Sequence, residues 1–148
     1  MDSRPLTDFA ESIVEVIPEV ARGFWKWEIK ELTSGAITPP QFFIMIYLHK
    51  MGQARMTDIA RYLFVTTAAS TGIVERLVKG GYVERVYDPA DRRIIKVKLT
   101  GKGLMMVKKT IGHKIDRIKE IFGKLSGTDR EAYLRILTNI KDILAQEQ

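Results

Sequence analysis

Residues 57–99 read TDIARYLFVTTAASTGIVERLVKGGYVERVYDPADRRIIKVKL. The first half of this run predicts two short helices, at 57–63 and 67–79, separated by a turn. Thr57 and Thr66 stand where N-caps are needed, and two glycines follow the second helix, where a helix commonly ends. A helix-turn-helix is therefore expected in this part of the chain.

Two strands joined by a basic loop are expected directly after these helices. Segments 82–87 and 94–99 are rich in β-branched and aromatic residues. Between them, Asp88-Pro89-Ala90-Asp91 is turn chemistry, because proline presets φ and aspartate caps a turn. Arg92-Arg93 then place positive charge at the tip, as a wing needs in order to reach phosphates. The expected fold is mainly α with a small antiparallel β-wing, a winged helix-turn-helix.

The loop and the segment after the second strand also resemble a known family. The run Asp88-Pro89-Ala90-Asp91-Arg92-Arg93, followed by Leu99-Thr100-Gly101-Lys102-Gly103, is similar to the motif of MarR-type transcription regulators. In that motif a wing Asp-x-Arg comes shortly before a Leu-Thr-x-x-Gly helix start. The resemblance in helix order covers nearly the whole chain, and its motifs are specific between residues 77 and 103.

This resemblance implies a sequence-specific, homodimeric DNA-binding regulator that reads a pseudo-palindromic operator. It implies that Arg93 enters the minor groove and that Asp91 orients it, while Arg92 is expected to meet phosphate or solvent. It further implies a repressor whose DNA affinity is relieved by a small aromatic or lipophilic anion.

The second helix of the run has two faces when residues are placed 100° apart. The face expected to be buried holds Ala69, Ser70, Ile73 and Leu77; the outward face holds Thr67, Ala68, Thr71, Gly72 and Glu75. Small residues with hydroxyls allow a helix to enter the major groove, although a merely tolerant surface is the alternative interpretation. The predicted DNA-contacting residues are Arg55, Thr66, Thr67, Ala68, Thr71, Arg76, Asp91, Arg92, Arg93 and Lys96.

Two residues in and after the turn depart from the usual helix-turn-helix pattern. Phe64 stands where a turn glycine is common, and Ser70 stands where an aliphatic residue is usual. We therefore expect a tightly packed turn and a Ser70 side chain that faces protein rather than DNA.

Two helices are expected before the helix-turn-helix. Apolar residues recur every three or four positions over 5–32, and Pro18 predicts a kink or a division into two helices. The next helix is expected at 39–51, with Thr38 as N-cap and Gln41 completing a capping box.

Aromatic residues in these two helices could serve a core or a ligand. The pair Phe42-Phe43 fits either interpretation, and core is favoured. The effector implied by the resemblance is expected near Trp25, Phe42 and Tyr47.

The C-terminal part predicts two amphipathic helices. Thr100 caps one that runs to about Leu125, with apolar residues at heptad spacing through Leu104, Ile111 and Ile118. Another is expected from a capping box at 128–131 onward. The predicted dimer interface comprises Phe9, Ile13, Ile111, Ile115, Ile118, Phe122, Leu137 and Ile140. A monomeric bundle that buries these faces within one chain is the alternative.

Composition places the chain among small globular proteins with a polyanionic partner. Its 148 residues fit one compact domain, divided into an N-terminal helical region 1–36, a winged helix 37–103 and C-terminal helices 104–148. The net charge of +6 divides into −3 over residues 1–33, +10 over 34–125 and −1 over 126–148. The sequence has no cysteine, no long apolar run and no signal-peptide pattern, so a cytoplasmic location is expected.

The residues that enzymes need do not come together in this sequence. His49 and His113 lie on different predicted helices without acidic neighbours at metal-ligand spacing, and no phosphate-binding glycine loop follows a strand. We expect no enzymatic activity, no metal and no cofactor. The alternative to a DNA-binding regulator is a winged-helix interaction module whose basic face binds an acidic protein.

Overall fold

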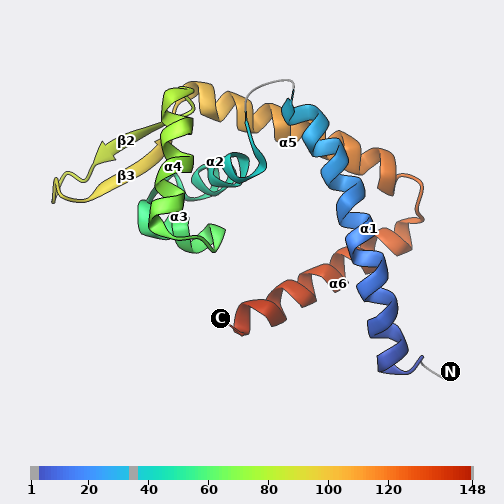
Figure 1. The fold of residues 1–148 in the computed structure, drawn as a ribbon. Coiled ribbons are helices and arrows are strands. Elements are labelled where there is room, and N and C mark those ends of the chain that lie inside the picture. Colours follow the sequence, from blue (N-terminus) through green and yellow to red (C-terminus); the bar gives the residue numbers. More distant parts are fainter. Residues whose placement is uncertain (1–3, 34–36, 148) are drawn as a thin grey trace. The chain divides into compact units, whose positions relative to one another are not determined.

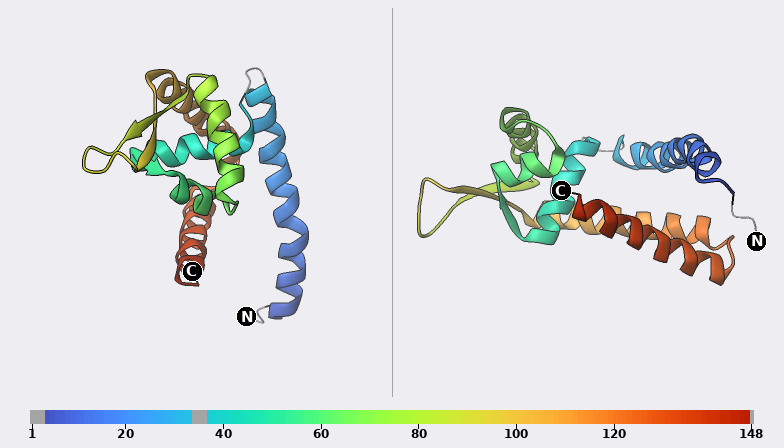
Figure 2. Two further views of the ribbon diagram at one scale, coloured as in Figure 1. Left: turned by 60° about the vertical axis from the view of Figure 1, so that its left-hand side comes forward. Right: turned by 90° about the horizontal axis from the view of Figure 1, so that it is seen from below.

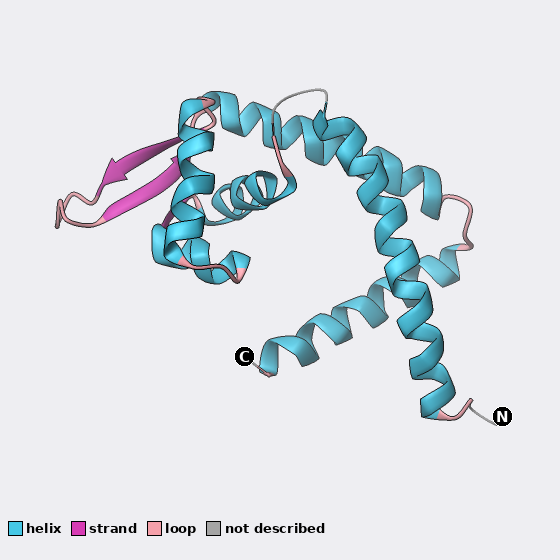
Figure 3. Cartoon of the chain, in the orientation of Figure 1, coloured by secondary structure: helices cyan, strands magenta, loops and turns pink. Residues whose placement is uncertain are grey.

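The computed structural model describes residues 4–33 and 37–147, with only the backbone for residues 25 and 27–33. Figure 1 shows the order of elements, which are α1 (Leu6–Thr33), α2 (Pro39–Met51), β1 (Gln53–Arg55), α3 (Met56–Leu63), α4 (Thr67–Lys79), β2 (Val83–Tyr87), β3 (Ile95–Leu99), α5 (Gly101–Phe122) and α6 (Gly127–Gln146). The chain divides into two units, Met1–Val107 and Lys108–Gln148. The mainly helical fold with a small β-wing, expected from the sequence, is confirmed (Figure 3).

The sheet has three antiparallel strands in the order β1-β3-β2. β2 and β3 form the wing, with Val83 opposite Leu99 at its base and Tyr87 opposite Ile95 toward its tip. Both views of Figure 2 show this hairpin extending beyond the helices around it. The sequence predicted two strands and missed β1, because a three-residue strand is too short to show an alternating pattern.

The core of the winged helix forms around α2, which contacts α3, α4 and β3. The fully buried side chains of this core include Ile44, Met45, Leu48, Ile59, Val74, Leu77, Val83 and Val97. The start of α2 is capped as predicted, since the Thr38 N–H donates to Gln41 Oε1 at 2.7 Å. Apolar burial of this kind contributes on the order of 1.5–3 kcal/mol for each large side chain.

At the later helix starts the structure confirms some of the predicted caps and corrects two of them. Thr66 caps α4 as expected, accepting from the Ala69 N–H at 3.1 Å. Thr57 does not cap α3, which begins one residue earlier because extended Arg55 ends β1 and is itself the N-cap. α6 begins at Gly127 rather than near Thr128, since Ser126 Oγ accepts from the Asp129 N–H at 3.1 Å and is the cap.

Of the two outcomes expected at Pro18, a kink or a division into two helices, the structure excludes the division. α1 runs as one element from Leu6 to Thr33 with Pro18 inside it. Proline removes a single main-chain hydrogen bond, and the helical pattern continues on both sides of it.

The second unit holds the end of α5 and all of α6. The rings of Phe122 and Tyr133 lie 5.3 Å apart, and Arg130 Nη1 donates to the Leu125 carbonyl at 3.3 Å. None of the described residues forms a helix long and apolar enough to cross a membrane.

Candidate nucleic-acid interface

The outward face of α4 is small and polar, as the sequence predicted. Thr66, Thr67 and Ala68 are exposed and Thr71 is half-buried. Thr71 Oγ1 donates to the Thr67 carbonyl at 2.8 Å, so its hydroxyl oxygen keeps acceptor capacity while its methyl group is available for apolar contact. This combination suits a base edge that offers an amino group or a methyl group.

The buried face of α4 is partly as expected. Ser70 is fully buried and its hydroxyl donates to the Thr67 carbonyl at 2.8 Å, so it faces protein as predicted. Ala69 is exposed, and Val74 occupies the core in its place. The buried stripe of the helix is Ser70, Val74 and Leu77, so the helix is rotated slightly from the expected orientation.

Asp91 holds Arg93 at the tip of the wing. Asp91 Oδ1 accepts from the Arg93 main-chain N–H at 3.0 Å and from Nε at 3.1 Å, and Oδ2 accepts from Nη2 at 3.2 Å. The hydrogen bonds from Arg93 lower the pKa of Asp91. Because the Arg93 side chain is 92% exposed, its guanidinium is oriented in solvent, ready for a partner.

Lys96 lies at the base of the loop, where it pairs with Asp88. The distance from Lys96 Nζ to Asp88 Oδ2 is 2.8 Å, and both side chains are mostly covered. The hydrogen bond from Lys96 is the main cause of a lowered pKa for Asp88, whose Oδ1 also accepts from the Ala90 N–H at 2.9 Å. Lys96, a predicted DNA contact, therefore anchors the wing loop in the structure. Only a known strand register could have indicated the Lys96–Asp88 pair.

The remaining predicted basic contacts lie exposed around the helix-turn-helix and wing. Within the described part of the chain, Arg55, Arg76 and Arg92 form no salt bridge. Lys98 pairs with Glu84 at 3.2 Å across the wing. The basic residues that remain available to bind a polyanion are therefore mostly arginines.

The turn between α3 and α4 is not tightly packed, which corrects the expectation from the sequence. The Phe64 side chain is 85% exposed, and its backbone is left-handed with φ 55° and ψ 41°. Main-chain bonds close the turn instead, from Phe64 N–H to Arg61 O at 3.2 Å and from Val65 N–H to Ala60 O at 3.0 Å. An aromatic residue in this backbone region is uncommon and costs free energy.

The residues expected near an effector lie in different surroundings. Phe42 is buried in the core, and Tyr47 stacks on Tyr62 with ring centroids 4.4 Å apart. The side chain of Trp25 lies outside the described residues.

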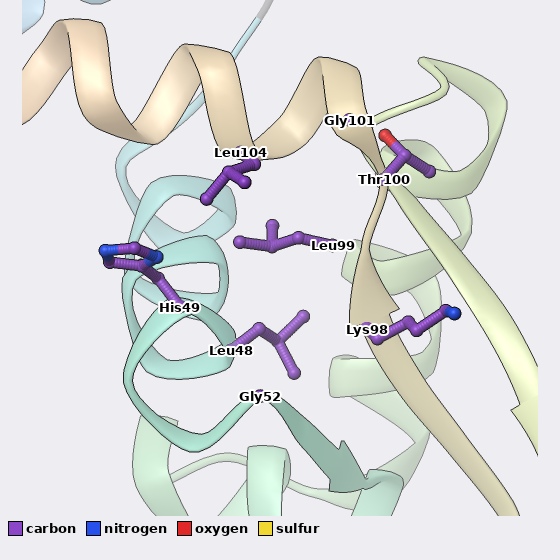
Figure 4. Close-up of a pocket in the computed structure, with 8 residues that line it drawn as sticks. All are labelled: Leu48, His49, Gly52, Lys98, Leu99, Thr100, Gly101 and Leu104. Atoms are coloured by element: carbon purple, nitrogen blue, oxygen red, sulfur yellow. The ribbon is translucent and has the colours of Figure 1, made fainter.

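A hollow of about 240 Å³ lies between the end of α2, the end of β3 and the start of α5. Figure 4 shows the side chains of Leu48, Leu99 and Leu104 converging there, while Lys98 points away. Leu104, placed by the sequence at the start of a helix–helix seam, thus faces its own winged helix. Within the described part of the chain, no three His, Asp or Glu residues gather as a metal site requires.

The residues predicted to form a dimer interface are apolar and largely uncovered. Phe9, Ile115, Ile118, Leu137 and Ile140 are exposed. Ile13, Ile111 and Phe122 are half-buried. No described residue of α6 is buried.

Comparison with known proteins agrees with this geometry. Residues 37–95 match the sequence model of the MarR family. The chain aligns over 97% of its length with 99% of a MarR family protein from Bacillus stearothermophilus, with a TM-score of 0.86 and 20% identity. The region 37–95 of this protein is therefore similar to the MarR family.

Relatives of this protein are named as transcriptional regulators. YsmB of Bacillus subtilis, an uncharacterized HTH-type transcriptional regulator, is 29% identical over 131 residues, which cover 88% of each chain. MdtR of the same organism, an HTH-type transcriptional repressor, is 29% identical over 75 residues, covering 51% of this chain and 48% of MdtR. Fold and relatives together support a DNA-binding transcriptional regulator.

One solved structure concerns control by a small molecule. BpsR of Bordetella bronchiseptica, whose DNA binding is described as regulated by 6-hydroxynicotinic acid, has a TM-score of 0.71 to this protein. The two chains are 23% identical, and the match covers 90% of this chain and 96% of BpsR.

Proposed function

We propose that this protein is a homodimeric, cytoplasmic repressor that binds a pseudo-palindromic operator and releases it when a small aromatic anion binds. The observation that carries DNA recognition is the Arg93 guanidinium, held by two hydrogen bonds to Asp91 at the exposed tip of the wing. With the small polar face of α4 in a major groove, such an arginine suits the narrow minor groove beside it. The direct test is a gel shift on selected sites with random duplex in excess.

The contribution of the wing is measurable by a double-mutant cycle. Arg93→Ala is expected to weaken operator binding by about 1–3 kcal/mol, most strongly where an A·T-rich minor groove flanks the half-site. Asp91→Ala is expected to reproduce part of this loss, because it releases the guanidinium. The double variant should lose no more than Arg93→Ala alone.

Additive losses in this cycle would mean that Asp91 acts independently, as a cap of the wing turn. If Arg93→Ala left the affinity unchanged on every sequence, the wing would not be a DNA element. An acidic protein would then become the favoured partner.

The exposed apolar residues of α1, α5 and α6 support an obligate homodimer. Ile115 and Ile118 on α5 are each 47% exposed, and Leu137 and Ile140 on α6 are 44% and 46% exposed. Apolar surface on this scale is usually covered by a partner. Sedimentation at micromolar concentration is expected to show one species near twice 16.9 kDa, whereas a monomer that binds DNA tightly would contradict the proposal.

Control by an aromatic carboxylate is supported by the resemblance to MarR-type regulators and by the ligand named for BpsR. We place the ligand near Phe42, Tyr47 or Trp25, and tryptophan fluorescence is the measurement of its binding. A carboxylate such as salicylate is expected to weaken DNA binding, since an effector must bind the free and DNA-bound forms with different affinity. No response in fluorescence or gel shift across a broad panel would favour a regulator without a small-molecule effector.

A further inference from the structure

Two large apolar side chains lie uncovered on the wing. Tyr87 is 66% exposed and Ile95 is 38% exposed, and the two are direct cross-strand partners. We call them the outer wing pair. Both lie beyond the part of the wing that packs into the core, where Val83 and Val97 are fully buried.

The outer wing pair lies on the side of the sheet that faces α4. Alternation along β2 places Tyr87 on the same face as Arg85 and Val83. Arg85 reaches Glu75 of α4, with 3.9 Å between Nη2 and Oε1, and this contact fixes which face is turned toward the helix. The opposite face carries the Lys98–Glu84 pair. The outer wing pair therefore continues the α4-facing side of the wing into solvent.

A hollow of about 460 Å³ lies beside Tyr87 of this pair and is lined by Tyr87, Asp88, Pro89 and Arg92. An aromatic ring, a proline ring and a guanidinium thus border one concave surface. The carboxylate of Asp88 is engaged by Lys96, which leaves Arg92 as the charged group available to a ligand there. Apolar rings beside a cation match the chemistry of a deoxyribose with its phosphate.

We propose that the outer wing pair and Arg92 bind the sugar–phosphate strand that separates the groove read by α4 from the groove entered by Arg93. The proposal rests on the DNA-binding function proposed above. A protein with one element in each of two adjacent grooves must straddle the backbone between them, and tyrosine and arginine are common partners of phosphate and sugar. The deoxyribose edges pack on Tyr87 and Ile95, and the phosphate meets Arg92 and the Tyr87 hydroxyl.

Affinity measured at several salt concentrations tests the proposal. Tyr87→Ala is expected to weaken binding about tenfold on operator and random duplex alike, because sugar contacts carry no sequence information. Its slope of log affinity against log salt should stay unchanged, since no cation is lost. Arg92→Ala should instead reduce the slope by about two for a dimer. Tyr87→Phe should retain most of the affinity.

Hydroxyl-radical footprinting adds a readout that a purely structural role would not move. Wild-type protein should protect deoxyriboses between the major groove and the flanking minor groove of each half-site, and Tyr87→Ala should lose that protection alone. Met105→Ala, at a side chain 73% exposed on α5, is the matched control and should change neither affinity nor footprint. The thermal unfolding midpoint should be unchanged in both Tyr87→Ala and Met105→Ala.

Three results would overturn the proposal: unchanged affinity of Tyr87→Ala, a loss confined to certain base sequences, or an intact footprint. If wild-type protein binds no duplex DNA at all, the proposed function fails together with this inference. If the wild type binds and Tyr87→Ala binds equally well, only this inference fails.

Discussion

Affinity for duplex DNA is expected to fall by about 10³–10⁵ between 50 and 200 mM salt, with a slope of about −5 to −9. The reason is release of counterions from about 6–10 phosphates by a dimer. Besides Arg93 at the tip of the wing, each protomer exposes the following cations around the helix-turn-helix and wing: Arg55, Arg61, Arg76, Lys79 and Arg92. Lys96 and Lys98 add little, because Asp88 and Glu84 already neutralise them within the chain.

Single substitutions show how much each basic residue contributes to this slope of log affinity against log salt. Arg76→Gln, on α4, is expected to reduce its magnitude by about two, since each dimer loses two phosphate contacts. Lys141→Gln is the matched control, because Lys141 lies on α6 and pairs with Asp142 at 3.2 Å. Fluorescence anisotropy with labelled duplex provides the measurement. A wild-type slope near zero would exclude nucleic acid as the partner.

The winged helix was predictable from sequence because its boundaries are set by local chemistry. Thr66 stands at the N-cap of α4 and accepts the expected bond, and Thr100 Oγ1 accepts from the Gly103 N–H at 3.1 Å at the start of α5. The Asp91–Arg93 contact was also predictable, because the resemblance implied it and the two residues stand only two positions apart in a tight loop. Local signals of this kind do not depend on the rest of the fold.

Features that depend on distant parts of the chain were missed or misread. β1 exists only because β3 pairs with it, through Ala54 opposite Val97. The Lys96–Asp88 pair depends on the wing register, so the sequence assigned Lys96 to DNA alone. Phe64 was expected to pack, yet nothing along the sequence shows that main-chain bonds close its turn without the side chain.

Gly103→Ala is expected to cost about 3 kcal/mol or more and to unfold much of the winged helix at 37 °C. A Cβ at this position would lie 2.0 Å from the Tyr82 carbonyl oxygen and 3.0 Å from its carbon. Both are backbone atoms, so no flexible side chain can move aside. Tyr82 is fixed as well, because its N–H donates to Leu77 O at 3.0 Å and its carbonyl accepts from Thr100 N–H at 3.1 Å.

Gly101→Ala is the matched control, two residues away in the first turn of α5 with nothing within 4 Å of the added Cβ. It should leave stability unchanged or raise it by about 0.4–1 kcal/mol, since alanine restricts the unfolded chain. Urea unfolding followed by circular dichroism, at one protein concentration, compares the two variants with wild type. Equal midpoints for Gly103→Ala and wild type would contradict the close approach of α5 to Tyr82. Of these two glycines, only Gly103 would place an added Cβ against backbone atoms. A loss of stability in both variants would therefore point instead to a general need for glycine at the helix start.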